Sequence, residues 1–565
     1  MDIDSKTVDL IQQIYGCIPE PLVRGLEKLS ADAASQAQNE LWSERDVVLI
    51  TYADQVRESG MTPLQSQRRF LLDHGLQELI RCVHLLPFCP FTSDDGFSVV
   101  DYLAVDPEVG TWQDITELGR DFDLMFDLVL NHASQKHHWF QAYLRGDAGY
   151  ENFFIEQNTN ADLSTVVRPR SLPLLTQFES SNGTRNVWTT FSADQVDLNY
   201  ANPRVMYLML ETLVEYARRG ARIIRLDAIA FLWKQIGTDC IHRPETHAAV
   251  KLMRRVLDKL VPGTLVLTET NVPHGENVSY FGCGDDEAHM VYQFSLPPLL
   301  LDAIHNTDTT VLRDWLSTIQ PPSEITTFFN FTASHDGIGV RPLEGIVSQE
   351  RVDKLAAIVR SHGGRVSNRR QSDGTDSPYE LNITYLDAVA DSSKVEPQEH
   401  SRCFLATQAI MLALPGIPAV YFHSLVGSPN DVAAVIETGQ NRRINRHKYE
   451  RQTLESVIAE PQGLQRRVFE GFRRLLAVRI AQPAFHPKAS MQVLPLAGDG
   501  LLGFVRTTET GERLAVVANL THSARVIPNG LVDEALAYDE LALERIWSED
   551  GIPMRPFQVR WLTAN

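Results

Sequence analysis

Short apolar runs alternate with longer segments of helical periodicity along most of this chain. Apolar runs that alternate with helices predict the strands of a parallel sheet that is buried on both faces. There are eight such runs, the number that a closed (β/α)8 barrel needs. The predicted strands are residues 47–52, 82–88, 124–130, 222–226, 264–268, 291–294, 326–331 and 419–422.

The helix before the fourth strand has the clearest end signals. Asn202 is a good N-cap, Pro203 falls at the first helical position, and Gly220 provides the stop. Its apolar face consists of Val205, Leu208, Met209, Leu213 and Tyr216. The most apolar stretch, residues 404–422, is interrupted by prolines, so it predicts a buried helix followed by a buried strand rather than a membrane span.

Two connections are too long to be simple loops. Residues 133–200 could form a small inserted domain, and residues 337–399 include turn-rich stretches at 362–364 and 371–378. Both connections leave the C-terminal ends of strands, where barrel enzymes build their active sites.

After a helix over residues 463–480 the pattern changes to short strands, at 501–507 and 513–520. We therefore expect an α/β protein with a TIM barrel, an inserted small domain after the third strand and a C-terminal β domain. The predicted parts are a helical N-terminal extension (1–45), the barrel (46–132 and 201–486), the inserted domain (133–200) and the β domain (487–565).

Composition narrows the functional classes. Of 565 residues, 43% are apolar and 22% charged, which excludes global disorder. The formal net charge of −20 argues against binding to nucleic acid or to an anionic membrane. The N-terminal segment lacks the apolar core of a signal peptide, and the six cysteines form no CxxC pair. A reducing cytoplasm is the simplest expectation.

Three carboxylates fall at the C-terminal ends of three predicted strands: Asp227, Glu269 and Asp336. Each one alone could simply cap a helix. Arg225, His132 and His335 lie at the same ends, and the combined set favours catalysis.

Such a set suits a retaining glycosyl transfer. One carboxylate attacks the anomeric carbon, and a second, kept neutral by a raised pKa, protonates the leaving oxygen; the two carboxyl groups lie about 5–5.5 Å apart. A cation beside the nucleophile keeps that group ionised. The remaining polar groups can hold sugar hydroxyls and stabilise an oxocarbenium-like state.

Four ordered motifs, DLVLNH, RLDAIAFLWK, LTET and ASHD, resemble the signature regions of the α-amylase superfamily. Within it the chain is similar to the sucrose phosphorylase subfamily. That similarity rests on ITYAD, LPFCPFTSDDGF, VRPR and GSPNDVAAVIETGQNRRINRHKY, and covers the chain from about residue 47 to the end of the barrel.

The resemblance implies a role for each matching residue. Asp227 would be the nucleophile, Glu269 the general acid/base and Asp336 the transition-state stabiliser. Arg170 would bind phosphate from the inserted domain. Residues expected to hold glucose are Asp94, Phe97, His132, Arg225, His335 and Arg446.

Phosphorolysis would follow from these roles. An α-glucoside would transfer its glucose to inorganic phosphate, giving α-glucose 1-phosphate and a free acceptor, with no cofactor and no metal. The loop at residues 53–57 offers too few oxygen ligands for calcium. Alternatively, Arg168 and Arg170 are merely solvated or pair with acids.

Three departures from typical sucrose phosphorylases concern the acceptor: Ala230–Trp233 after the nucleophile, residues 237–247, and the loop at 363–382. They resemble the branch that contains glucosylglycerate phosphorylases. The loop carries Arg365, Arg369 and Arg370, which would suit a carboxylate-bearing acceptor or could simply face water.

Several alternatives stay open. Glucosylglycerate is the favoured substrate, and sucrose, sucrose 6-phosphate and glucosylglycerol are the others. A hydrolytic α-glucosidase would share the three carboxylates, whereas a non-catalytic sugar-binding protein would be expected to have lost one. The sequence leaves both a monomer and a homodimer open.

Overall fold

The computed structural model describes residues 1, 3–29, 41–170, 172–370, 375–496, 498–546 and 550–564. Eight parallel strands close into a barrel in the order β1-β16-β12-β11-β10-β9-β4-β3, which confirms the predicted barrel. The strands are β1 (Val48–Thr51), β3 (Cys82–Leu85), β4 (Asp123–Val129), β9 (Ala221–Asp227), β10 (Leu265–Thr268), β11 (Met290–Tyr292), β12 (Thr327–Phe331) and β16 (Ile417–Tyr421).

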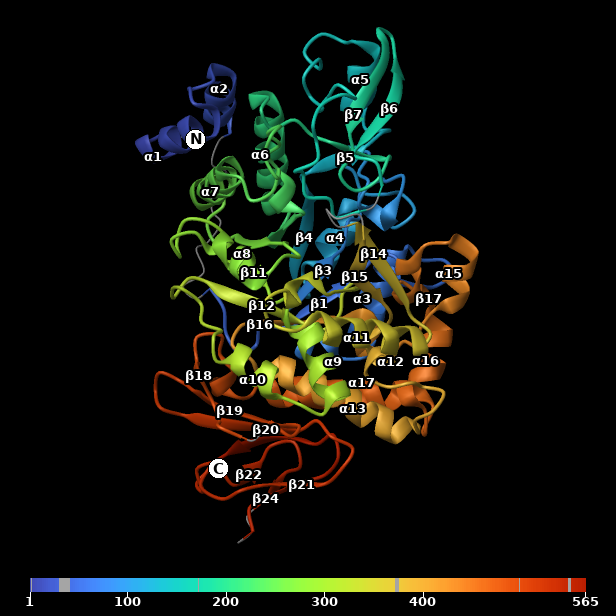
Figure 1. The fold of residues 1–565 in the computed structure, drawn as a ribbon, viewed down its shortest axis with the longest axis vertical. Coiled ribbons are helices and arrows are strands. Elements are labelled where there is room, and N and C mark those ends of the chain that lie inside the picture. The colour runs from blue at the N-terminus through green and yellow to red at the C-terminus, as the bar shows by residue number, and fades with distance from the viewer. Residues whose placement is uncertain are drawn as a thin grey trace.

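Helices surround the barrel (Figure 1). They are α3 (Pro63–Asp73), α4 (Trp112–Leu118), α6 (Pro203–Arg218), α7 (Pro244–Leu260), α8 (His274–Val278), α9 (Leu296–Asn306), α10 (Thr310–Leu316), α13 (Pro397–Ala413), α14 (Phe422–Leu425), α15 (Val432–Thr438), α16 (Arg451–Ala459) and α17 (Leu464–Arg479). The predicted ends of α6 are confirmed: the Asn202 side chain accepts from the Arg204 amide at 3.0 Å, and Gly220 has φ +101°. The apolar stretch at 404–422 forms most of α13 and then β16.

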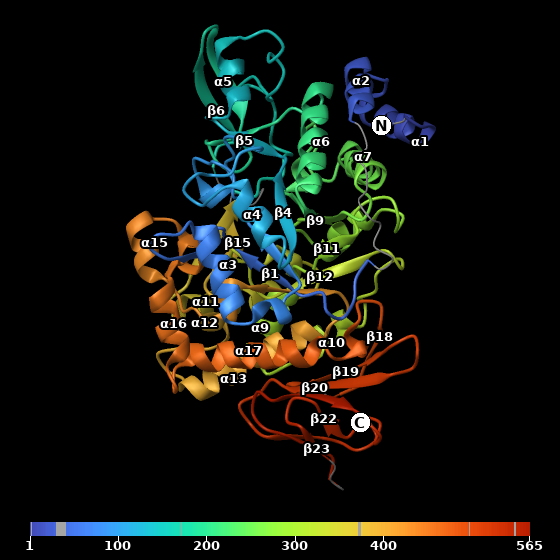
Figure 2. The same ribbon diagram turned by 180° about the vertical axis from the view of Figure 1, so that it is seen from behind.

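The connection between β4 and β9 projects from one end of the barrel (Figures 1 and 2). It contains β5 (His132–Ser134), α5 (His138–Arg145), β6 (Leu175–Ser180), β7 (Gly183–Trp188) and β8 (Gln195–Asp197). β5 pairs antiparallel with β8, so the first and last parts of the connection lie together at the barrel end. Lys234 holds this junction with its Nζ 2.6 Å from both Asp197 Oδ2 and Asn131 Oδ1.

The connection after β12 folds into a three-stranded sheet beside the same barrel end. Its strands are β13 (Ile338–Gly339), β15 (Asp376–Asn382) and β14 (Arg365–Arg370), in that order, and it also contains α11 (Gln349–Ser361) and α12 (Tyr385–Val389). Gly363, with φ +84°, lies in the turn that leads from α11 to β14. Of the predicted turn at 371–378, residues 371–374 lie outside the described part of the chain.

A separate antiparallel sheet follows the barrel at the C-terminal end (Figure 1). Its strands are β18 (Ser490–Val493), β19 (Leu501–Thr507), β20 (Arg513–Asn519), β25 (Val559–Thr563), β22 (Tyr538–Asp539) and β23 (Glu544–Arg545), with β21 (Arg525–Ile527) and β24 (Ile552–Met554) paired beside it. The N-terminal helices α1 (Ser5–Tyr15) and α2 (Glu20–Lys28) pack outside the barrel on α7 and α6. Within the described ranges, no helix combines the length and the apolar character that a bilayer crossing requires.

Candidate active site

The three predicted carboxylates line one open cavity at the C-terminal end of the barrel. Asp227 is the last residue of β9, Glu269 follows β10 directly, and Asp336 lies in the loop after β12. Five more of the predicted site residues line the same cavity: Asp94, Phe97, His132, Arg170 and His335. The other two, Arg225 and Arg446, are buried behind the lining and contact it. The structure therefore brings all ten together.

Arg225 connects the carboxylates of β9, β4 and β10. Arg225 and Asp227 are two residues apart on one strand, so their side chains point to the same face. The Arg225 guanidinium donates to Asp227 Oδ1 at 2.8 Å, lies 4.0 Å from Glu269 Oε2, and also donates to Asp127 on the neighbouring strand. Asp127 in turn contacts His84 Nε2 at 2.6 Å. This network fixes the Arg225 side chain behind Asp227.

Asp227 and Glu269 share a buried environment that favours one proton between them. Burial raises the pKa of both groups, and the negative charge of Glu269 raises that of Asp227 further. Arg225 lowers both pKa values, but only Asp227 receives its 2.8 Å hydrogen bond. Burial raises the pKa of Asp227 more strongly than that of Glu269. The hydrogen bond to Asp227 is nevertheless charge-assisted, whereas Glu269 accepts only from the neutral Ala228 amide, so the geometry favours the proton on Glu269 and the negative charge on Asp227.

The backbone after Asp227 also approaches Glu269. Ala228 has the left-handed φ of +52°, which costs a non-glycine residue about 1 kcal/mol or more. In this conformation the Ala228 amide donates to Glu269 Oε2 at 3.0 Å. The turn thus fixes the position of the Glu269 carboxyl group relative to the strand that carries Asp227.

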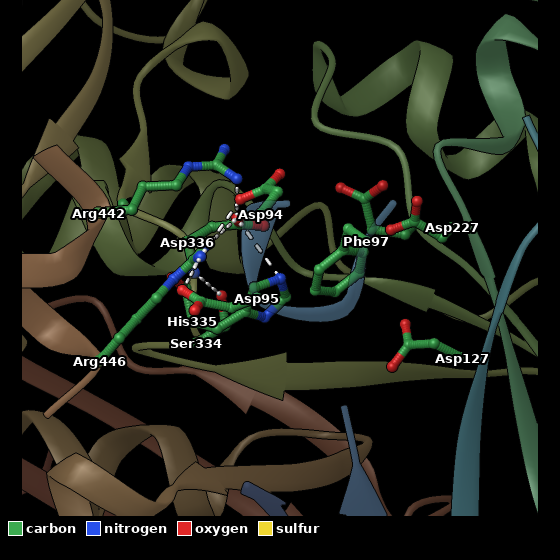
Figure 3. Close-up of polar contacts among 12 residues, drawn as sticks. Asp94, Asp95, Phe97, Asp127, Asp227, Ser334, His335, Asp336, Arg442 and Arg446 are labelled. Atoms are coloured by element: carbon green, nitrogen blue, oxygen red, sulfur yellow. Dashed lines mark hydrogen bonds and ion pairs between the residues drawn. The ribbon is translucent and has the colours of Figure 1, made fainter. Parts of the chain in front are cut away.

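Asp336 lies among arginines. Arg442 Nη1 is 2.5 Å from Asp336 Oδ1, and Arg446 Nη2 is 3.8 Å from the same oxygen (Figure 3). Burial alone would raise the pKa of Asp336, but the nearby guanidinium groups outweigh it and lower that pKa. Asp336 is therefore ionised, in contrast to Glu269.

Asp94 and Asp95 lie in a tight turn that faces Arg446. Both aspartates have φ near +50°, and Gly96 has φ +112°. A Cβ on Gly96 would lie 2.5 Å from the Pro87 carbonyl oxygen, so only glycine fits there. Arg446 Nη1 lies 3.2 Å from Asp94 Oδ1 and 2.7 Å from Asp95 Oδ2 (Figure 3).

Phe97, His335 and His132 form the aromatic part of the cavity wall. The rings of Phe97 and His335 stack with centroids 4.6 Å apart, and His132 Nε2 lies 2.9 Å from the Phe97 carbonyl oxygen. Burial lowers the pKa of both histidines, so their rings are neutral near pH 7. His335 Nδ1 is buried with no hydrogen-bond partner among the described residues.

Arg170 reaches the cavity from the connection between β4 and β9. Its Nη1 is 3.5 Å from Glu380 Oε2, and about a quarter of its side chain is exposed. Both carboxylate oxygens of Glu380 already accept from Arg442, at 2.9 and 2.8 Å. Arg170 therefore does pair with an acid, as one alternative expected, but only at long range, because Glu380 binds Arg442 more closely. Arg168 is exposed and donates to the Leu172 carbonyl.

Comparison with known proteins agrees with this geometry. Residues 76–356 match the family model of the α-amylase catalytic domain. The chain is 48% identical to a glucosylglycerate phosphorylase of Allomeiothermus silvanus, over 85% of this chain and 87% of the relative. It is 42% identical to a glucosylglycerate phosphorylase of Escherichia coli, over 99% of both chains. The chain belongs to the glycoside phosphorylases of the α-amylase family.

A solved phosphorylase of the family has the same fold. The crystal structure of sucrose 6F-phosphate phosphorylase from Thermoanaerobacter thermosaccharolyticum superposes with a TM-score of 0.73 and 26% identity, over 86% of this chain and 96% of that chain. The resemblance drawn from the sequence motifs is thereby confirmed.

Two of the three loop arginines considered for the acceptor of this phosphorylase lie outside the cavity. Arg365 is exposed and donates to the Gly363 and Gly364 carbonyls, while Arg369 binds Glu344. Neither side chain lines the cavity, because both extend from β14, the strand of the small sheet farthest from β13. The side chain of Arg370 lies outside the described part of the chain.

Several cavity residues of the phosphorylase have no role in the sequence analysis. Arg442 lies four residues before Arg446 in one of the motifs of the sequence analysis, and its partner Glu380, which lies behind the lining, is in the loop at 363–382. Arg341 and Tyr379 also line the cavity. Charged residues in long connections have no periodicity, so the only available signal was their presence in these motifs.

Proposed function

We propose that this phosphorylase is a retaining glucosylglycerate phosphorylase. It would transfer glucose from glucosylglycerate to inorganic phosphate, giving α-D-glucose 1-phosphate and free glycerate. Two relatives that align with most of this chain have that name. The observation that carries the proposal is the position of Arg170, a cation from another segment that lines the same cavity as Asp227, Glu269 and Asp336.

In the first step, Asp227 attacks the anomeric carbon as the bond to the glycerate oxygen breaks. Glu269 gives its proton to that oxygen, so glycerate leaves with its hydroxyl group restored. The shared buried proton described above supplies the acid, and the Arg225 hydrogen bond keeps the Asp227 oxygen anionic until it forms the glucosyl ester.

In the second step, a phosphate oxygen attacks the same carbon from the face that glycerate left. The bond to Asp227 breaks, and the ionised Glu269 accepts the proton that phosphate loses. Two inversions restore the α configuration. The ionised Asp336 faces the cavity in both steps and would stabilise the positive charge that develops on the sugar ring.

Glucose would be held by the buried part of the cavity. The Asp94 carboxylate can accept from sugar hydroxyls, and the free Nδ1 of His335 is available to another hydroxyl. Phe97, which stacks on His335, offers an apolar surface to the ring. Arg446 would act mainly by holding Asp94, and Arg225 by holding Asp227.

Phosphate would bind Arg170. The 3.5 Å separation from Glu380 leaves the planar donors of this arginine unsatisfied by any described carboxylate, and a guanidinium fits two phosphate oxygens at once. A plain hydrolase would need no such cation. This is the observation that favours a phosphorylase over an α-glucosidase.

The proposal is tested by incubating the protein with glucosylglycerate, with and without phosphate, and following early products by proton NMR. We expect α-glucose 1-phosphate only when phosphate is present. Sucrose, sucrose 6-phosphate and glucosylglycerol serve as parallel substrates. Free glucose at the same rate in both conditions would favour the hydrolase, and a β-phosphate would exclude the covalent intermediate.

A further inference from the structure

Three arginines line the cavity among the described residues: Arg170, Arg341 and Arg442. Arg442 is matched by Asp336 and Glu380, both at hydrogen-bond distance. Arg341 is different, because its one ion pair among the described residues is a long one, with Nη2 3.7 Å from Glu276 Oε2. Glu276 is also 45% exposed and contacts His242 Nε2 at 3.2 Å. Arg341 is thus the least neutralised buried cation of the cavity.

The Arg341 side chain is only 13% exposed, and its Nε is buried without a hydrogen-bond partner in the described ranges. Its backbone begins a 3-10 turn, Arg341–Leu343, that the Ser295 hydroxyl anchors through the Pro342 carbonyl at 3.1 Å. A buried guanidinium with an unused donor, held by an anchored turn, is a prepared site for an anion.

Arg341 lies on the side of the cavity where the leaving group must be. Glu269 has to reach the leaving oxygen, and Asn271 lines the cavity two residues beyond Glu269. Gly339, two residues before Arg341, packs against Asn271 so closely that an added Cβ would lie 2.5 Å from the Asn271 amide. The backbone that leads into Arg341 therefore packs against the segment that follows Glu269, and all three residues Arg341, Asn271 and Glu269 line the same cavity.

We propose that Arg341 binds the carboxylate of the acceptor and sets the preference of this phosphorylase for an acid over a neutral polyol. This inference rests on the proposed function. The buried Oδ1 of Asn271, which has no partner in the described structure, is placed to accept from an acceptor hydroxyl. Glycerate offers both groups, a planar carboxylate and adjacent hydroxyls.

The test uses α-glucosyl fluoride as the donor, because fluoride leaves without a bound acceptor. Each variant is given D-glycerate or glycerol, which differ in the carboxylate, and the transfer products are quantified. In Arg341→Leu the ratio of D-glycerate to glycerol transfer efficiency should fall about 10- to 100-fold, the effect of losing a charge-assisted contact. The exposed Arg360→Leu on α11 is the matched control and should keep the wild-type ratio.

If the ratio of D-glycerate to glycerol transfer is unchanged in Arg341→Leu, including the case in which both transfers fall equally, the assignment is overturned. If Arg341→Leu releases no fluoride at all, Arg341→Gln is measured in the same way and its ratio decides. Failure of the proposed function looks different: the wild type itself would then form no glucosylglycerate from D-glycerate, and the inference would fall with it.

Discussion

The two ends of the cavity are built in opposite ways. On the glucose side Arg446 is 1% exposed and bound to two aspartates, and it comes from a loop that packs against the barrel. On the acceptor side Arg170 and Arg341 come from long connections, and within the described part of the chain each has one ion pair, at 3.5 and 3.7 Å. The difference fits the proposed reaction, in which glucose stays bound while two anions, glycerate and phosphate, exchange. A site that must release its ligand twice in each cycle needs cations with free donors.

The largest expected effect on turnover is that of replacing Asp227, where the glucose and acceptor ends of the cavity meet. Asp227→Ala should lower kcat by more than about 10⁴-fold with every donor, because no covalent intermediate can form. Phosphate-dependent release of glucose 1-phosphate measures it. The exposed Asp162→Ala is the control, and wild-type turnover in Asp227→Ala would rule out the mechanism. Asp336→Asn should leave only a trace.

Glu269→Gln tests whether Glu269 supplies the proton of the leaving group. Without a proton donor, turnover of glucosylglycerate should fall about 10²- to 10⁴-fold, whereas α-glucosyl fluoride, which needs little protonation, should lose far less. Equal losses with both donors would remove the acid role from Glu269.

The pH profile tests the same group. The first step needs protonated Glu269, and its raised pKa keeps that form present at higher pH than an ordinary glutamic acid would allow. The value of kcat/KM for glucosylglycerate should therefore fall as pH rises through this pKa. The fall should be absent in Glu269→Gln, and its persistence there would assign it to another group.

Stability should distinguish the two ends as well. Arg446→Met leaves Asp94 and Asp95 without their buried partner and should lower the free energy of unfolding by about 3–5 kcal/mol. Arg170→Met removes a partly exposed cation and should cost less than about 1 kcal/mol. Urea denaturation of both variants measures this, and equal losses would mean that the two ends are equally rigid.

The sequence could predict the barrel because its strands are apolar runs of the right length, such as β12 and β16, and because helices such as α6 have strong caps. The small sheet β13-β15-β14 was not predicted. Strand β14 is polar and has no apolar run to mark it, and the very short strand β13 pairs with β15, a segment distant in sequence.

The residues of the candidate site also fall into two groups, those that the sequence could predict and those that it could not. Asp227 and Glu269 could be found because strand ends of a parallel barrel meet at one face. The cations Arg341 and Arg442 could not, since only the folded connections bring them to the cavity. Of the two alternatives left open for Arg365 and Arg369, the described side chains favour the one without a role at the acceptor, because local partners bind both.

The most direct test of the central claim is the fate of the glucosyl group in Arg170→Ala. At fixed phosphate, the ratio of free glucose to glucose 1-phosphate should rise about 10- to 100-fold, because phosphate loses a charge-assisted contact while water still reaches the intermediate. The surface variant Arg513→Ala should keep the wild-type ratio. An unchanged ratio in Arg170→Ala would contradict the account and leave the hydrolase as the better reading of this site.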